Sequence, residues 1–122
     1  MNMIDHITLR VSNIEKAATF YNEVLSHVGY SRLSGEFDGA ICFTVDNGSD
    51  IWIYQDDTPS QNVHMCFVVE SKETVEEFHT SGIAAGGIDN GKPGIRLEYG
   101  EDYYAAFIYD LDGNNIEAVF RG

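Results

Sequence analysis

The chain has 122 residues, of which 43% are hydrophobic and 22% charged, and this composition is typical of one globular domain with a core of its own. Twenty acidic residues against seven basic ones give a net charge of −13. A field of that sign disfavours nucleic acid or an anionic membrane as a partner, and it favours a neutral or cationic small molecule or a bound cation.

Three further features concern the location of the protein in the cell. No apolar run approaches the length of a membrane span, and the N-terminal residues lead directly into a predicted strand without the pattern of a signal peptide. Cys42 and Cys66 have neither metal-binding nor redox spacing. We therefore expect a cytoplasmic protein in which both cysteines are reduced, buried thiols.

The first half of the chain predicts a strand, a helix and three more strands. Ile7, Leu9 and Val11 alternate with polar residues, as in a half-buried strand. Ser12-x-x-Glu15 is a capping-box pattern that predicts a helix start, and Gly29 is the expected stop. In chain order we expect these elements at residues 4–11, 13–28, 30–34, 39–45 and 50–55.

The second half repeats this order after a polar linker at residues 55–62. A strand at 63–69 and a helix at 73–85 precede a region at 88–103 that is rich in glycine and charge. Strands at 104–109 and 115–120 close the chain as a hairpin.

A shift of 58 residues places His6 on His64, and a shift of 65 places Trp52 on Glu117. The chain therefore contains two copies of a unit of about 60 residues, with module one at 1–58 and module two at 62–122 of a single domain. We expect an α+β fold in which two βαβββ modules form a curled eight-stranded mixed sheet with helices on the convex face.

Alternation within the strands predicts which side chains face away from the helices. If the helix covers the face with Leu9 and Val11, then His6 and its counterpart His64 point to the opposite, concave face. Glu117 lies between Ile116 and Ala118 and should also point there. We expect a pocket on this face, with Trp52 in its wall.

These motifs resemble the vicinal-oxygen-chelate superfamily, which includes glyoxalases, bleomycin-resistance proteins and extradiol dioxygenases. The resemblance is carried by Asp5-His-Ile-Thr-Leu-Arg-Val11, Phe20-Tyr-Asn-Glu-Val-Leu25, His64-Met-Cys-Phe67 and the run from Tyr104 to Glu117. It implies that His6, His64 and Glu117 are metal ligands, while Trp52 occupies the fourth ligand position and cannot bind a metal. Two imidazoles and a carboxylate suit a divalent ion such as Fe, Mn, Ni or Zn.

The resemblance implies a metal-dependent lyase, isomerase or dioxygenase that acts on a small oxygen-bearing substrate, with Glu117 also catalytic. Residues expected to contact the substrate are Thr8, Arg10, Trp52, Cys66 and Tyr104. A standard glyoxalase I reaction is not expected, because a carboxylate is missing at Trp52. The fosfomycin-resistance branch is disfavoured too, because few basic residues are available. The alternative function is a metal-free binding protein of the bleomycin-resistance type.

Related small proteins often pair their modules across subunits, so we also expect a homodimer in which His6 of one chain completes a site with His64 and Glu117 of the other. Several alternatives stay open at this stage. Glu117 could pair with Arg10, Cys66 could be a packing residue, and Tyr103, Tyr104 or Tyr109 could supply a proton. The run from Asp110 to Asn114 fits a tight hairpin turn better than a calcium loop.

Overall fold

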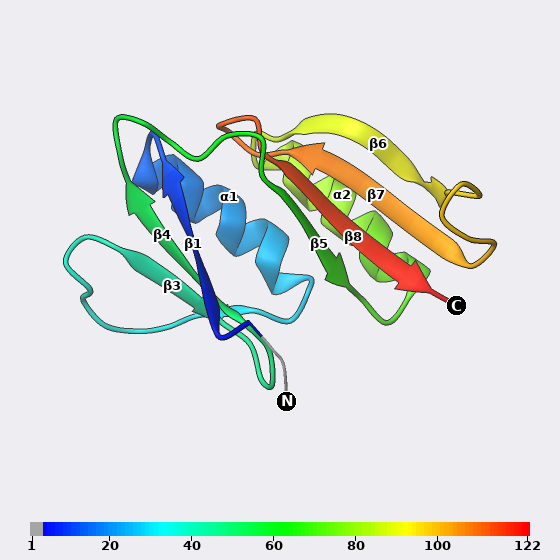
Figure 1. The fold of residues 1–122 in the computed structure, drawn as a ribbon, viewed down its shortest axis with the longest axis horizontal. Coiled ribbons are helices and arrows are strands. Elements are labelled where there is room, and N and C mark those ends of the chain that lie inside the picture. Colours follow the sequence, from blue (N-terminus) through cyan, green and yellow to red (C-terminus); the bar gives the residue numbers. More distant parts are fainter. Residues whose placement is uncertain (1–3) are drawn as a thin grey trace.

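The computed structural model describes residues 4–122, which form two halves of the same design (Figure 1). The elements of module one are β1 (His6–Val11), α1 (Ile14–Ser26), β2 (Ser31–Arg32), β3 (Ile41–Thr44) and β4 (Asp50–Gln55). Those of module two are β5 (His64–Val68), α2 (Lys72–Ala84), β6 (Ile88–Ile95), β7 (Tyr103–Tyr109) and β8 (Asn115–Arg121). The expected element order is confirmed, with boundaries that differ by a few residues.

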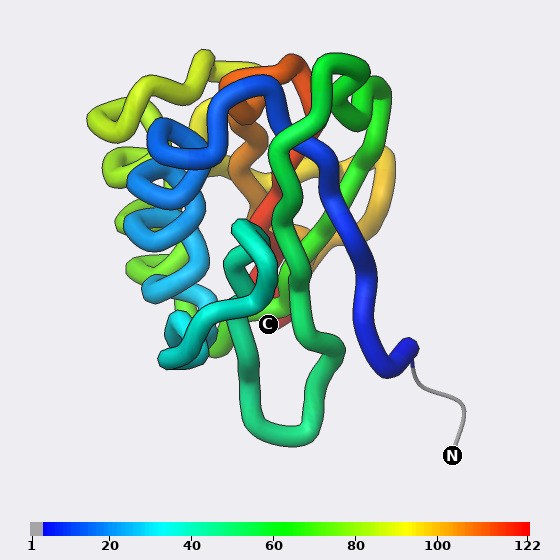
Figure 2. The backbone as a smooth tube through the Cα atoms, turned by 90° about the vertical axis from the view of Figure 1, so that its left-hand side faces the viewer, coloured from blue at the N-terminus to red at the C-terminus, as the bar shows by residue number. Residues whose placement is uncertain are grey.

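Each module contains one mixed four-stranded sheet. The strand orders are β1-β4-β3-β2 and β5-β8-β7-β6, and in each sheet the first strand runs parallel to its neighbour while the others are antiparallel. The two sheets lie side by side in Figure 1, and Figure 2 shows both helices together on one side of them. The predicted α+β class and helix-covered sheets are confirmed. No described helix is long and apolar enough to cross a bilayer.

One core lies between the helices and the sheets and joins the two modules. Leu9 and Val11 of β1 are buried in it, as the alternation predicts. Phe20 and Val24 of α1 and Phe78 of α2 are completely buried in the same cluster. Since this core occupies the helix side, the opposite face of each sheet is left for polar and aromatic side chains.

The start of α1 differs from the prediction. Asn13, and not Ser12, is the N-cap, because its side-chain oxygen accepts a hydrogen bond from the Lys16 N–H. The Ser12 N–H donates instead to Asp112 Oδ2 in module two, 3.1 Å away. The capping-box prediction was therefore wrong by one residue, since the Asn13 side chain caps the helix.

Gly82, an unfavourable residue for a helix interior, is explained by a close approach of two elements. The residue is buried where α2 packs on β7, and a Cβ atom there would come within 2.3 Å of Ile108 Cδ1. Any larger residue would require the Ile108 side chain to move.

The β7–β8 turn is a second link between the modules. Asp110 is buried, and its carboxylate accepts hydrogen bonds from the backbone N–H groups of Asp112 and Asn114. The Tyr21 hydroxyl of α1 donates to the same carboxylate at 2.5 Å. Burial and this acidic partner raise the pKa of Tyr21 well above its ordinary value of 10.0. The run is a hairpin turn, as expected, and it also anchors α1.

Candidate functional site

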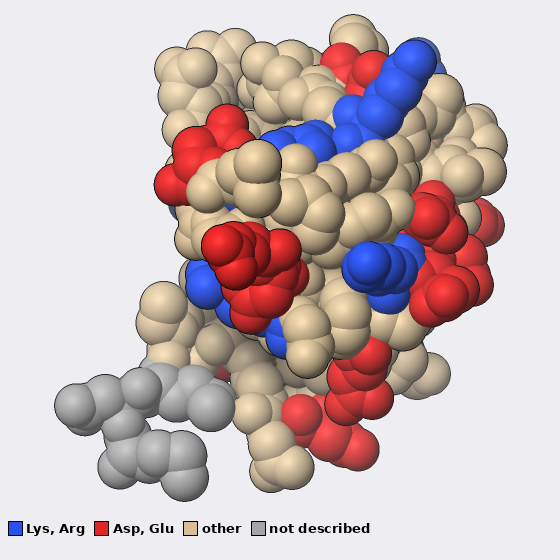
Figure 3. All heavy atoms as spheres, turned by 90° about the vertical axis from the view of Figure 1, so that its right-hand side faces the viewer, with Lys and Arg blue, Asp and Glu red and all other residues tan. Residues whose placement is uncertain are grey.

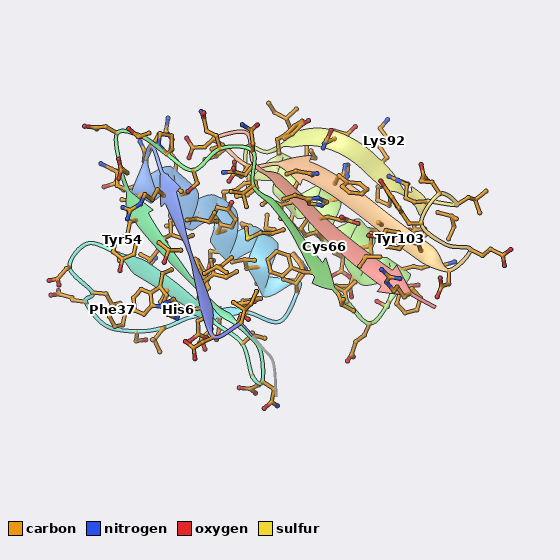
Figure 4. All side chains as sticks on the ribbon, viewed as in Figure 1. His6, Phe37, Tyr54, Cys66, Lys92 and Tyr103 are labelled. Carbon is orange, nitrogen blue, oxygen red and sulfur yellow. The ribbon has the colours of Figure 1, made fainter. Side chains whose placement is uncertain are left out.

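A polar cluster lies on the sheet of module two, on the face away from the helices. Glu117 of β8 is at its centre, and its Oε1 atom lies 2.8 Å from Nε2 of His64 on β5. The Tyr103 hydroxyl of β7 donates to the other carboxylate oxygen at 2.5 Å. Strand register places Cys66 and Phe107 on either side of Glu117. We call His64, Cys66, Tyr103 and Glu117 the carboxylate cluster; Figure 4 labels two of its members.

Local sequence explains this arrangement. Ile116 and Ala118 are completely buried on the helix side, so the residue between them must face the other way. The parallel pairing of β5 with β8 then brings the imidazole of His64 to Glu117. Only 2% of Glu117 is exposed, and both of its carboxylate oxygens have partners. A buried charge needs such partners, so the cluster satisfies its own central group.

Burial and the Glu117 carboxylate together raise the pKa values of two neighbouring side chains. Burial and the hydrogen bond to Glu117 raise the pKa of Tyr103, so its hydroxyl keeps its proton at neutral pH. Partial loss of solvent and the charge of Glu117 raise the pKa of the Cys66 thiol from 9.0 to about 12. Cys66 is therefore a protonated thiol and not an activated nucleophile. The expectation that it is buried was wrong: it is exposed on the open face of an edge strand, whereas Cys42 is buried as expected.

Module one presents an aromatic surface at the equivalent place. Trp52 of β4 stands between Thr8 of β1 and Cys42 of β3 in the strand register. The Phe37 ring, from the loop before β3, packs edge-on against Trp52 with 5.1 Å between ring centroids. Sequence analysis missed Phe37, because no short-range pattern connects this loop residue to β4.

His6 begins β1 and has no contact with the carboxylate cluster. Its Nδ1 atom lies 2.7 Å from the carboxylate of Asp5, and its side chain is 55% exposed. Arg10 does not pair with Glu117: it lies 3.2 Å from Asp56 and over the ring of Tyr54. The structure thus brings His64 and Glu117 together within one chain but leaves His6 apart.

Tyr104, expected at the substrate, faces the other side of the sheet. Its hydroxyl donates to Glu76 of α2 at 2.8 Å, and Lys72 of the same helix lies over its ring. The reason is the strand period of two, which places adjacent residues on opposite faces. Of the three tyrosines that could supply a proton, Tyr103 is the one bound to Glu117.

No group of three or more His, Cys, Asp or Glu side chains suited to hold a metal ion occurs within residues 4–122 of a single chain. A hollow of about 790 Å³ lies between α1 and the loop around Phe37, and its wall includes Ile14, Thr19 and Ile41. This hollow is lined by residues of α1, the loop and the neighbouring strands β2 and β3, and not by the carboxylate cluster. His6 and His64 are both exposed in the single chain, so the expected pocket on the concave face is not closed around them.

Comparison with known proteins identifies the family. The profile of the Glyoxalase/Bleomycin resistance protein/Dioxygenase superfamily matches residues 3–118. The chain belongs to this superfamily. No curated protein matches it significantly.

Solved structures of the superfamily share the fold over nearly the whole chain. A glyoxalase/bleomycin resistance protein from Albidiferax ferrireducens T118 is 26% identical with a TM-score of 0.84, over 99% of this chain and 100% of that one. A family enzyme from Burkholderia phytofirmans PsJN is 17% identical with a TM-score of 0.79, over 99% and 100%. A mutant of the fosfomycin-resistance protein FosX from Listeria monocytogenes, complexed with Mn(II) and 1S,2S-dihydroxypropylphosphonic acid, is 20% identical with a TM-score of 0.73, over 98% and 90%.

Proposed function

We propose that this member of the superfamily is a metal-dependent enzyme, a lyase, isomerase or dioxygenase, that acts on a small oxygen-bearing substrate. The observation that carries the proposal is the buried Glu117 carboxylate in contact with the His64 imidazole, with the Tyr103 hydroxyl on its second oxygen. A cluster of this kind costs desolvation energy that an apolar residue would avoid, which argues for a chemical role.

The donor set fits a divalent ion in its chemistry. An imidazole nitrogen and a carboxylate oxygen at 2.8 Å already face one another, and both are common ligands of Fe, Mn, Ni and Zn. The Tyr103 hydroxyl would hold the carboxylate in place from its far oxygen, as outer-sphere hydrogen bonds do in metal sites. One chain supplies two of the three proposed ligands, and the third is His6.

We therefore propose a homodimer in which His6 of a partner subunit joins His64 and Glu117. Two features support this arrangement. His6 and His64 occupy equivalent positions on exposed faces, and β1 and β5, which carry them, are both edge strands. Val68 at the end of β5 is 74% exposed, an unusual state for an apolar strand residue that pairing would relieve.

A bound divalent ion would supply Lewis-acid stabilisation of the oxyanion or enolate charge that develops on substrate oxygens. The chain's own groups would divide the remaining work. Glu117 would serve as ligand and proton acceptor, and Tyr103 would keep its proton and orient Glu117. Cys66 would contact the substrate as a neutral thiol, and Thr8, Arg10 and Trp52 would line the opposite wall.

Substrate choice follows from the missing carboxylate at Trp52. Glyoxalase I chemistry moves a proton between adjacent carbons, and an indole has no acceptor for that proton. The proposed substrate is uncharged or weakly anionic and partly aromatic or apolar. We expect little turnover of the methylglyoxal–glutathione adduct even with metal present; a second-order rate constant near the ordinary enzymatic range, about 10⁴ M⁻¹s⁻¹ or more, would contradict this.

The decisive experiment measures metal uptake by protein purified without a histidine tag. We expect one divalent ion per Glu117 site by elemental analysis, and a higher melting temperature in Mn(II), Fe(II), Co(II), Ni(II) or Zn(II), since a ligand of the folded state stabilises by mass action. Glu117→Gln should abolish both effects and keep the fold. His6→Gln should weaken them, and light scattering should give the mass of a dimer.

His79→Gln is the matched control for His6→Gln. His79 bonds Asp89 at the α2–β6 contact, away from the carboxylate cluster, so its replacement should leave metal binding unchanged. Metal binding that survives Glu117→Gln would exclude the proposed ligand set. A monomeric mass at micromolar concentration would exclude the shared site.

A second candidate function is a metal-free protein that sequesters an apolar or cationic compound. The Trp52–Phe37 pair favours it, because two perpendicular rings offer a large apolar contact surface. An absence of any metal effect on the melting temperature would decide for this alternative.

A further inference from the structure

Arg96 is a cation without an acidic partner in a strongly acidic protein. Among the described residues, no Asp or Glu oxygen lies within ion-pair distance of its guanidinium. Four of the seven basic residues, Lys72, Lys92, Arg96 and Arg121, belong to module two. On the side that shows β6 and the end of β8, blue side chains lie among the red ones (Figure 3). Basic and acidic side chains therefore lie together on this side of the molecule.

The Arg96 side chain is held in position by its surroundings. It follows β6 directly, and its guanidinium lies over the Phe107 ring, 5.4 Å from the ring centroid. One of its nitrogens donates to the backbone carbonyl of Lys92 at 2.7 Å. A Cβ at Gly91 would come within 3.1 Å of that nitrogen and within 2.9 Å of Phe107, and Gly91 has a φ of +154° that favours glycine. The β6 irregularity at Gly91 thus makes room for a fixed cation.

The same ring connects Arg96 to the carboxylate cluster. The His64 ring lies 6.2 Å from the Phe107 ring, and Phe107 pairs with Glu117 across β7 and β8. Arg96 and His64 are thus both neighbours of one aromatic surface. A guanidinium has five N–H donors in a planar fork, and one of them is used by Lys92. The remaining donors suit the two oxygens of a carboxylate.

We propose that Arg96 is a specificity-determining residue that binds the carboxylate of a small monoanionic ligand whose apolar part lies on Phe107. The inference rests on the proposed function in that it places this ligand beside the same cluster. It defines the weakly anionic substrate expected there more closely: one carboxylate, and an aromatic or apolar body that reaches from Arg96 towards His64 and Glu117.

The test compares two probes of nearly equal size, the anion phenylacetate and the neutral phenylacetamide, by NMR titration of the full chain with and without added Zn(II), which is diamagnetic. We expect phenylacetate to shift the resonances of Arg96 and Phe107 and to bind about tenfold more tightly than the amide, the size of one charge-assisted hydrogen bond. The preference is also measured without metal. A failure of this inference can therefore be distinguished from a failure of the proposed metal site.

Arg96→Gln should remove the preference for phenylacetate. Arg96→Lys should retain part of it, because lysine keeps the charge but loses the fork. Lys92→Gln is the matched control: it removes the same charge four residues away, within β6, and should change the affinity by less than about twofold. Melting temperatures of all variants report whether the β6 irregularity is preserved.

Three outcomes would overturn the inference. Equal affinity of the two probes, or no shift with either, would show that no carboxylate site exists. An equal loss of affinity in Arg96→Gln and Lys92→Gln would show that only the general positive charge of this segment matters.

Discussion

The two modules have the same strands and helix, and their open faces carry opposite chemistry. In module two, the central residue on the open face of the last strand is Glu117, which binds His64 and Tyr103 beside the exposed thiol of Cys66. In module one the matching residue is Trp52, which packs against Phe37 beside the buried thiol of Cys42. The helix side of each sheet forms one shared core and tolerates little change. The difference teaches that the open face can carry a polar site or an aromatic wall without altering the scaffold.

The hairpin turns of the two modules also differ: one contains a buried, hydrogen-bonded aspartate and the other an exposed one. Asp110 in module two is 4% exposed and binds two backbone N–H groups, the Asn114 amide and the Tyr21 hydroxyl. Asp46 at the matching turn of module one is exposed and makes no side-chain hydrogen bond among the described residues. Module two therefore anchors the helix of module one, and there is no equivalent anchor in the other direction at this turn.

The largest effect is expected from breaking this anchor. Asp110→Ala leaves the Tyr21 hydroxyl and several turn groups unpaired in the core, and it should lower the free energy of unfolding by about 3–5 kcal/mol. Asp46→Ala, in the corresponding turn of module one, should change the same quantity by no more than about 0.5 kcal/mol. Urea unfolding followed by circular dichroism measures both values. Equal losses in the two variants would mean that the turns are equivalent after all.

The next largest effect is expected on metal affinity when the open face of module one receives a carboxylate like that of module two. Trp52→Glu gives module one the carboxylate that module two has, and under the proposed shared site it adds a fourth ligand. Affinity for Mn(II) should rise about tenfold, as measured by calorimetry. Trp52→Phe removes the indole without adding a ligand and is the control. If Trp52→Glu binds Mn(II) no better than Trp52→Phe, then module one does not face the metal ligands of module two.

A smaller effect is expected on the alkylation rate of the two cysteines. Cys66 is exposed, but its pKa of about 12 should make it slow to react with iodoacetamide at pH 8. Glu117→Gln removes the neighbouring charge, lowers that pKa and should speed the reaction several-fold, roughly in proportion to the thiolate fraction. Cys42 is buried and should stay unmodified in both proteins. Peptide mass spectrometry reads each site, and an unchanged rate at Cys66 would show that Glu117 does not control it.

The smallest effect is the response to alkaline pH. The pKa values of Tyr21 and Tyr103 are raised in the folded state, so their contribution is complete below pH 10.0, the ordinary value, and is lost as the pH rises further. Cys66 adds a loss of the same sign that begins near pH 9.0. Tyr103→Phe should make the fall of stability above pH 10 less steep. Thermal melts across this range measure the slope, and a steeper fall in the variant would contradict the assignment.

Local patterns in the sequence were enough to predict most of the fold. The period of two in β1 and β8 identified the buried face, because burial of Leu9 or Ile116 leaves the intervening residues no other direction. The internal repeat then placed His64 and Glu117 on one open face, and the parallel register brings them into contact. These predictions depended only on neighbours in sequence and on a repeat of one strand order.

Only the tertiary structure decided the contacts made by residues distant in sequence. Asn13 is the helix cap, and the Ser12 N–H binds Asp112, a hundred residues away. Phe37 covers Trp52 from a loop with no regular period. Arg96 lies on Phe107 because β6 is irregular at Gly91, and an irregular strand breaks the alternation on which sequence reasoning depends. Strand periodicity is a local property of the chain, whereas caps, loop contacts and bulges depend on what the fold brings beside them.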